Sequence, residues 1–355
     1  MRCRDGQWAA VRLRWLPMAG SDAKSNQGGT AGDGASGAGG GFVAWAGSGV
    51  PLILFTLLSW ASIPLFLRQL SGSEAQGGWG LDPFAANAWR YGISAAFWLP
   101  FLIIAWRRGK LPPVLFKLAL VPVLFNVVGQ SFFAWGPKLL DPGFFSFVFR
   151  VQVVFVTLGA YLLFPEERGA LRSPRYWFGL AGVVGGSVGL ILLADRSVGN
   201  VSTLGVVVAL ASGVLFAGYG MAVRYFVSGL PPIIAFGVIC QFTALGVIAV
   251  GFATGPSNLA HVFSWNAWQI FTLVASAFIG IAISHVAYYA SLKRLGVSVS
   301  MGIIQLQPVL TAAGSMVIFN ERLNTWQWCA GLLGVCGAVL MLTTGKKIKT
   351  DEAEG

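Results

Sequence analysis

Several polar residues lie inside long apolar runs, where they are the side chains best placed to bind a solute. Arg150 follows Gly143 by seven residues in one such run, with no carboxylate nearby in that run. Charge inside a bilayer is expensive and usually marks a pathway, so this arginine predicts an anchor for a substrate carboxylate or phosphate. The alternative is an arginine that reaches the interface or hydrogen-bonds another helix. Arg90, in NAWRYG, is closer to the end of its run, which favours a structural role, either capping carbonyl groups or pairing with another helix.

A histidine in a later run adds a second polar surface. His285 has Tyr288 and Tyr289 three and four residues downstream, so the three side chains share one face of a helix. That face suits either the wall of a polar cavity or a histidine satisfied between helices.

Amide side chains recur in the same runs. Each alone is better explained by hydrogen bonds between helices than by contact with a ligand, but together they would form a binding site if they converge on one cavity. The candidate binding residues are Arg150, His285, Tyr288, Gln305, Gln307, Asn126, Gln130, Tyr219, Trp60 and Arg90.

The acidic residues are informative because all thirteen lie outside the middle of the apolar runs. This distribution disfavours a carboxylate proton relay or a sodium cage and leaves His285 as the candidate for coupling to protons, if protons are coupled at all. The sequence shows no phosphate-binding glycine loop, zinc spacing or nucleophile elbow. We therefore expect no enzyme activity, no cofactor and no metal site.

Composition indicates the class of protein. Hydrophobic residues make up 55% of the chain and charged residues 10%, with a mean hydropathy of +0.71. Soluble domains contain about 25% charged residues, so the chain is an integral membrane protein whose main partner is the lipid bilayer. We expect ten spans, at 50–69, 84–106, 114–135, 143–164, 176–194, 203–225, 233–253, 267–290, 297–319 and 326–344.

The distribution of lysine and arginine predicts the orientation. If both termini are cytoplasmic, the inner segments hold eighteen of the 24 basic residues and the outer segments hold four, among them Arg68 and Arg322. The net charge of +11 is thereby explained by topology and by contact with anionic lipid, so no nucleic-acid partner is expected. We expect a multi-pass protein of the cytoplasmic (inner) membrane.

Two stretches of the chain are alike. Gln152 aligns with Gln307 at an offset of 155 residues, and Glu167-Arg168 aligns with Glu321-Arg322 at 154. We interpret this as an internal duplication, with a first repeat at 48–198, a second at 199–345, a disordered tail at 1–47 and a short tail at 346–355. Five spans per repeat is an odd number, so the fold expected is all-α, with ten transmembrane helices in two inverted five-helix repeats.

Small residues spaced four apart recur in the last span of each repeat. Gly182 with Gly186, Gly185 with Gly189, and Ala330 with Gly334 would let helices approach closely. Two interpretations are open, a homodimer interface and packing within one chain.

These motifs resemble the drug/metabolite transporter superfamily, in particular its EamA-type permeases. The matching segments are Gln307-Pro308-Val309 with the downstream Asn320-Glu321-Arg322, Glu166-Glu167-Arg168, Arg90 in the second span, and the stretch from Ala287 to Gly296.

The resemblance implies a carrier of small metabolites that has ten helices and a central cavity built by both halves. In bacterial members it implies export of amino acids or related compounds, and Arg150 favours a solute that bears a carboxylate. The function expected is outward transport of such a solute by alternating access. The alternatives are a carrier of nucleotide sugars, nucleosides or cationic drugs, and a membrane scaffold that transports nothing.

Overall fold

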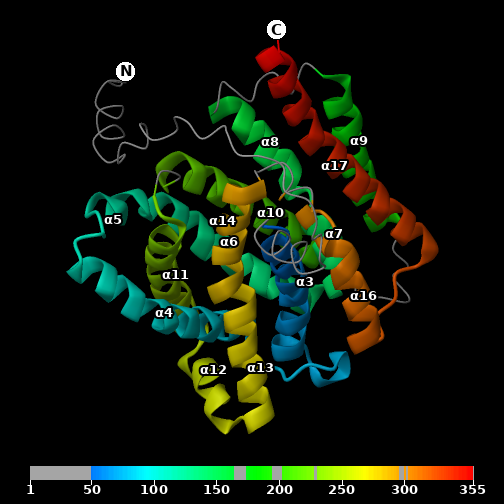
Figure 1. Ribbon diagram of the computed structural model, residues 1–355. Coiled ribbons are helices and arrows are strands. Elements are labelled where there is room, and N and C mark those ends of the chain that lie inside the picture. The colour runs from blue at the N-terminus through cyan, green and yellow to red at the C-terminus, as the bar shows by residue number, and fades with distance from the viewer. Residues whose placement is uncertain are drawn as a thin grey trace, which may run out of the picture.

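The structure is a computed structural model that describes residues 49–163, 173–193, 202–227, 230–295, 300 and 303–354 (Figure 1). Every regular element in these ranges is helical. The predicted tail at 1–47 and the motif Glu166-Glu167-Arg168 lie outside the described residues. The tail predicted at 346–355 is helical as far as Glu354, in continuity with the last apolar helix.

The first half of the chain contains eight described helical elements. They are α3 (Val50–Ser71), η1 (Glu74–Gln76), α4 (Pro83–Arg107), α5 (Val114–Leu118), α6 (Leu120–Leu139), α7 (Pro142–Phe149), α8 (Gln152–Leu163) and α9 (Pro174–Leu192).

The second half contains nine described helical elements. They are α10 (Thr203–Val227), α11 (Pro232–Thr254), α12 (Pro256–Ala260), η3 (His261–Ser264), α13 (Ala267–Ala277), η4 (Phe278–Ile283), α14 (Ser284–Leu295), α16 (Gln307–Phe319) and α17 (Thr325–Glu354).

Eight helical segments of the described chain are long and apolar enough to cross a membrane. They correspond to the first eight predicted spans, and two shorter apolar helices, Gln307–Phe319 and Thr325–Met341, lie where the ninth and tenth were expected. The protein is therefore a multi-pass, all-helical membrane protein in the part described, and the count of ten remains a prediction.

Proline and its neighbours set where several helices begin. Pro83 occupies the first turn of α4, and the carboxylate of Asp82 accepts the backbone N–H groups of Phe84 and Ala85, both at 3.0 Å. Pro142, Pro174 and Pro232 occupy the same place in α7, α9 and α11. A first-turn proline loses no hydrogen bond and already has a helical φ, so these residues start helices without leaving a buried donor unpaired.

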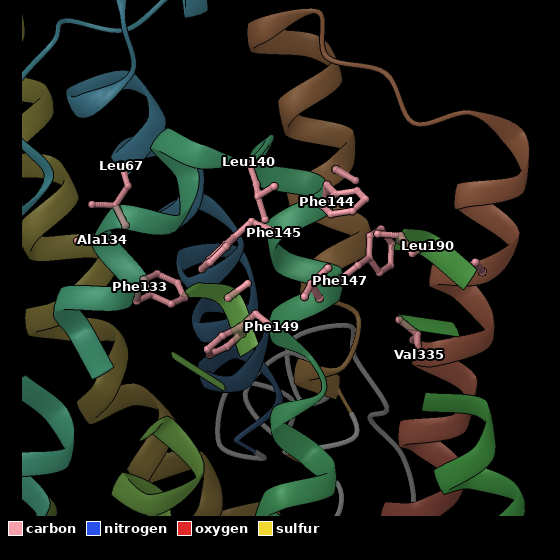
Figure 2. Close-up of a cluster of buried hydrophobic side chains, with 14 residues drawn as sticks. Leu67, Phe133, Ala134, Leu140, Phe144, Phe145, Phe147, Phe149, Leu190 and Val335 are labelled. Carbon is pink, nitrogen blue, oxygen red and sulfur yellow. The ribbon is translucent and has the colours of Figure 1, made fainter. Parts of the chain in front are cut away.

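A cluster of phenylalanines joins the two halves. Phe133 of α6 meets Phe145 and Phe149 of α7 edge to face, with ring centroids 5.2 and 5.1 Å apart. Figure 2 shows these rings on one side of α7 and Phe147 on the side that faces Leu190. Residues of α10, α16 and α17 complete the cluster, so the core spans both halves of the chain.

The helices α9 and α17 lie side by side at one edge of the molecule (Figure 1), and their glycines are the contact surface. A Cβ on Gly186 would lie 2.6 Å from the Ala330 carbonyl oxygen, and one on Gly337 would lie 2.5 Å from that of Gly179. Gly182 also faces Gly337, whereas Gly185 has no neighbour within 4 Å. Packing within the chain thus accounts for Gly182 and Gly186, and a homodimer stays a prediction.

Gly186→Ala should destabilise the protein by about 1–3 kcal/mol, because the methyl group has to displace the backbone of α17. Gly185→Ala is the matched control on the same helix; it should be neutral or slightly stabilising, since alanine favours helix. Thermal unfolding of the purified protein in detergent compares the two variants. Equal effects would show that α9 and α17 are not in this close contact.

Candidate functional site

Two predicted spans are interrupted at equivalent places in the duplication. The first has turn residues at Arg150 and Val151 between α7 and α8, and the second at Gln305 and Leu306 before α16. Arg150 aligns with Gln305 at the same offset of 155 residues that aligns Gln152 with Gln307. Each span was expected as one helix, and discontinuous helices are the usual way in which transporters build a site near the midplane.

Proline explains one break but not the other. Pro308 has no N–H to donate to the carbonyl of Ile304, which interrupts the helix at 305–306. The aligned position in the first copy is Val153, which keeps its N–H and donates it to the Arg150 carbonyl at 3.1 Å. Proline therefore does not account for the first break, where the Arg150 side chain reaches Gln307 next to the second break.

A chain of hydrogen bonds connects both breaks to α3. Arg150 Nη2 donates to Gln307 Oε1 at 2.6 Å, and Gln307 Nε2 donates to the Trp60 carbonyl at 3.0 Å. That carbonyl needs a partner because Pro64, four residues on in α3, has no N–H. Gln307 supplies the missing donor, and Thr311 Oγ1 donates to the neighbouring Ala61 carbonyl at 2.9 Å.

The space beside Arg150 is small. A cavity of about 10 Å³ is lined by Phe147, Arg150, Ser187 and glycines of α9 and α17, which is room for about one water molecule. Arg150 is buried, and its Nε has no hydrogen-bond partner among the described residues. The structure is thus closed around this guanidinium.

Trp60 also carries the aromatic part of the site. Its ring lies 4.8 Å from that of Tyr288 and 5.4 Å from that of His285, and its Nε1 donates to Ser284 Oγ at 3.2 Å. The His285 ring stacks on Phe236 at 4.8 Å, and its Nδ1 lies 3.1 Å from the Ile281 carbonyl, which can only accept. In a neutral ring, an Nδ1 that donates to this carbonyl leaves Nε2 as the acceptor.

Arg90 contacts a π-helical segment of the other half. A Cβ on Gly280 of η4 would come within 2.9 Å of Arg90 Nη2. Ser94 Oγ and Trp98 Nε1, one and two turns on along the same face of α4, lie 3.1 and 3.2 Å from the carbonyls of Ala277 and Ala282. π-Segments frequently occur at functional sites because they leave such carbonyls outside the regular ladder.

The two buried arginines differ in what they contact. Arg90 is 1% exposed, and neither its Nε nor its Nη2 has a hydrogen-bond partner in the described part of the chain. The recorded salt bridges of the described residues involve neither Arg90 nor Arg150. The sequence favoured a capping role for Arg90 and an anion for Arg150, yet Arg90 is the one with more donors unused.

The remaining candidates make other contacts. Asn126 Nδ2 donates to Thr243 Oγ1 at 3.0 Å, and the backbone carbonyl of Gln130 accepts from Asn87 Nδ2 at 3.2 Å, so the side chains of Asn126 and Asn87 connect helices. Tyr219 packs against Phe216, and Gln305 is buried at the second break. The structure therefore brings Arg150, Gln307, Trp60, His285 and Tyr288 into one connected group, with Arg90 next to the segment that leads into His285.

Sequence reasoning missed two features of this region. The first is the π-helix η4, which has no proline to announce it. The second is Arg68, expected in an outer segment but found 2% exposed in the last turn of α3, where it pairs with Asp141 and Glu321. The available signal was that all three charges adjoin helix ends. In the described ranges no group of three His, Cys, Asp or Glu side chains could hold a metal ion.

Comparison with known proteins agrees with this architecture. A curated relative, the uncharacterized transporter YyaM of Bacillus subtilis (strain 168), is 21% identical over 267 residues, which cover 73% of this chain and 84% of that protein. One crystal structure of a protein superposes with a TM-score of 0.55 at 19% identity, over 85% of this chain and 98% of that one. At this identity the second likeness concerns the fold alone.

A family model matches the chain twice, over residues 47–193 and 203–343. The two matches cover most of the chain and divide it where the duplication does, so a two-repeat architecture fits. The chain belongs to the EamA-like transporter family.

Proposed function

We propose that this protein exports a small solute bearing a negative group, an amino acid or related carboxylate, across the cytoplasmic membrane by alternating access. Membership of the family supports a transporter of small solutes. The observation that carries the finer proposal is the pair of arginines buried within spanning helices, each with unused donors and no carboxylate partner in the described residues.

An arginine in this position is stabilised by an anion. Guanidinium groups donate two parallel hydrogen bonds to a carboxylate, and a charge-assisted hydrogen bond contributes about 1.5–3 kcal/mol. Arg90 has two nitrogens without a hydrogen-bond partner among the described residues of the closed structure, so it can donate to the negative group of a solute without first giving up a hydrogen bond. Arg150 donates to the neutral oxygen of Gln307, which a carboxylate can replace with a gain in charge complementarity.

The rest of the connected group fits a mixed solute. The rings of Trp60, Tyr288 and Phe236 provide apolar surface, and His285 Nε2 provides an acceptor that an ammonium group can use. A solute with one negative group, one donor group and a small apolar part therefore matches the side chains. A quaternary ammonium compound would meet two guanidinium groups and no carboxylate in this connected group of side chains.

The closed structure supports alternating access. The Arg150 and Gln307 side chains connect the breaks of the two repeats, and the cavity beside them holds about one water molecule. A solute enters only if α7 and α16 move apart at one end. Chain breaks with few helical hydrogen bonds are suitable hinges for such a motion.

Proteoliposomes test the solute class. We expect uptake of labelled amino acids, or their exchange against unlabelled ones, and no uptake of a quaternary ammonium dye, because the charges proposed to meet the solute, Arg90 and Arg150, are both positive. A nucleotide sugar is the third arm of the assay, since its phosphates also suit arginine. Uptake of the dye alone would contradict the proposal, and uptake of the nucleotide sugar alone would replace carboxylate by phosphate.

Arg90→Gln should weaken transport of the anionic solute about tenfold to a hundredfold, mainly through a higher KM, because one charge-assisted contact is lost. Arg107→Gln is the matched control; it changes an exposed arginine at the end of the same helix and should leave transport unchanged. Transport kinetics together with unfolding temperatures separate binding from folding. Wild-type KM in Arg90→Gln would remove Arg90 from the site.

A further inference from the structure

A charged cluster lies at the end of the bundle where α3 ends. Arg68 Nη1 donates to the Pro137 carbonyl of α6 at 2.8 Å. Its Nη2 donates to Asp141 Oδ1, just before α7, at 3.2 Å, and to Glu321 Oε1, just after α16. One buried side chain therefore ties together three elements of the first repeat and one of the second.

The residue before Glu321 explains how that carboxylate enters the protein. Asn320 has a φ of 55°, the one positive φ of a non-glycine residue in the described chain, and it ends α16. Asparagine tolerates this left-handed conformation, so the chain can turn back on the helix. Glu321 Oε2 then accepts a hydrogen bond from Ser315 Oγ of α16, while the next residue, Arg322, is exposed.

The cluster does not balance its charge. One guanidinium and two ionised carboxylates leave a net charge of −1, and one bound proton would make the cluster neutral. Arg322 and Lys138, the nearest basic residues along the chain, are exposed. The charged groups that face one another from α3, α6, α7 and α16 are therefore Arg68, Asp141 and Glu321, together with the Ser315 hydroxyl and the Pro137 carbonyl.

Burial makes this surplus negative charge costly. Burial raises the pKa of the Asp141 and Glu321 carboxyls. The negative charge of Asp141 raises the pKa of Glu321 further, to about 7, whereas the positive charge of Arg68 lowers the pKa of both carboxyls. The positive charge of Arg68 does not cancel this rise in pKa, because two carboxylates share it.

We propose that Arg68, Asp141 and Glu321 form a proton-binding latch that holds this end of the protein closed while one proton is bound. The latch rests on the alternating access proposed above but is independent of the solute. If both termini are cytoplasmic, this end faces the outside.

The direction of the pH effect follows from linkage. The closed cluster leaves 20% of the Asp141 side chain and 13% of the Glu321 side chain exposed. It therefore binds a proton more tightly than an open cluster in water, where a glutamate has its ordinary pKa of about 4.3. Lowering the pH must therefore favour the closed state, and raising it through about 7 must favour opening. A simple ion pair predicts the opposite, because protonation would break it.

The accessibility of a buried cysteine distinguishes a proton-binding latch from a simple ion pair. Ser146 of α7 is 1% exposed and lies five residues inside Asp141, so Ser146→Cys is a small change at a position that opening should expose. The full-length protein in lipid nanodiscs is labelled with a maleimide between pH 5.5 and 8.5, and mass spectrometry identifies the labelled site. Rates are divided by those of Lys138→Cys, exposed at the same end, to remove the ordinary effect of pH on thiols.

We expect the normalised rate to rise about tenfold or more across this range. When Glu321→Gln is combined with Ser146→Cys, the cluster keeps one positive charge on Arg68 and one negative charge on Asp141. Labelling should then become slow and independent of pH. Asp141→Asn should behave alike, which covers the case that one variant misfolds. Glu74→Gln, an exposed acid in η1, is the matched control and should keep the wild-type response.

A normalised labelling rate that does not change with pH in the Ser146→Cys protein would overturn the latch. So would a Glu321→Gln variant whose labelling rate at every pH equals the rate of the unsubstituted latch at pH 8.5. The second result would mean that Glu321 is only an ion-pair partner. Because the assay uses no solute, these outcomes are separate from a failure to transport.

Discussion

In a bilayer, a polar group without a partner has no water to turn to, and this constraint organises the centre of the protein. Pro64 leaves the Trp60 carbonyl without its helical donor, and the side-chain NH2 group of Gln307 supplies one. The side-chain oxygen of the same Gln307 accepts a hydrogen bond from Arg150. Each unsatisfied group would cost several kcal/mol in hydrocarbon. The breaks in the two repeats are thereby held together by side chains that each satisfy another.

The same constraint gives the closed structure two distinct layers. Inside the spanning helices, Arg90 and Arg150 have unused donors and no salt bridge in the described ranges, so this layer is short of negative charge. At the end of α3, two carboxylates share Arg68, so that layer is short of positive charge. A carboxylate solute would neutralise the first layer and a proton the second. In both places the missing charge is one that an incoming species can supply.

The duplication and the long apolar runs were enough to predict an all-helical membrane protein of this family, because in lipid a single spanning segment satisfies its own backbone hydrogen bonds only as a helix. The helix breaks were less predictable. Pro308 signals one of them, but Val153 at the aligned position does not, and the side chain at that break, Arg150, contacts Gln307, 157 residues away in the sequence. Likewise, spacing put His285 and Tyr288 on one face, whereas their contact with Trp60 depends on how α3 packs against α14. Arg68 looked like a loop residue because its partners, Asp141 and Glu321, are distant in sequence.

The central claim is that the buried arginines bind a negative group. Thermal unfolding of the purified protein against a panel of metabolites tests it most directly, since a ligand that binds only the folded protein raises its unfolding temperature with concentration. Carboxylate-bearing solutes should raise the unfolding temperature, and their amides or quaternary ammonium analogues should not. Stabilisation by cationic solutes, with none by any anion in the panel, would contradict it.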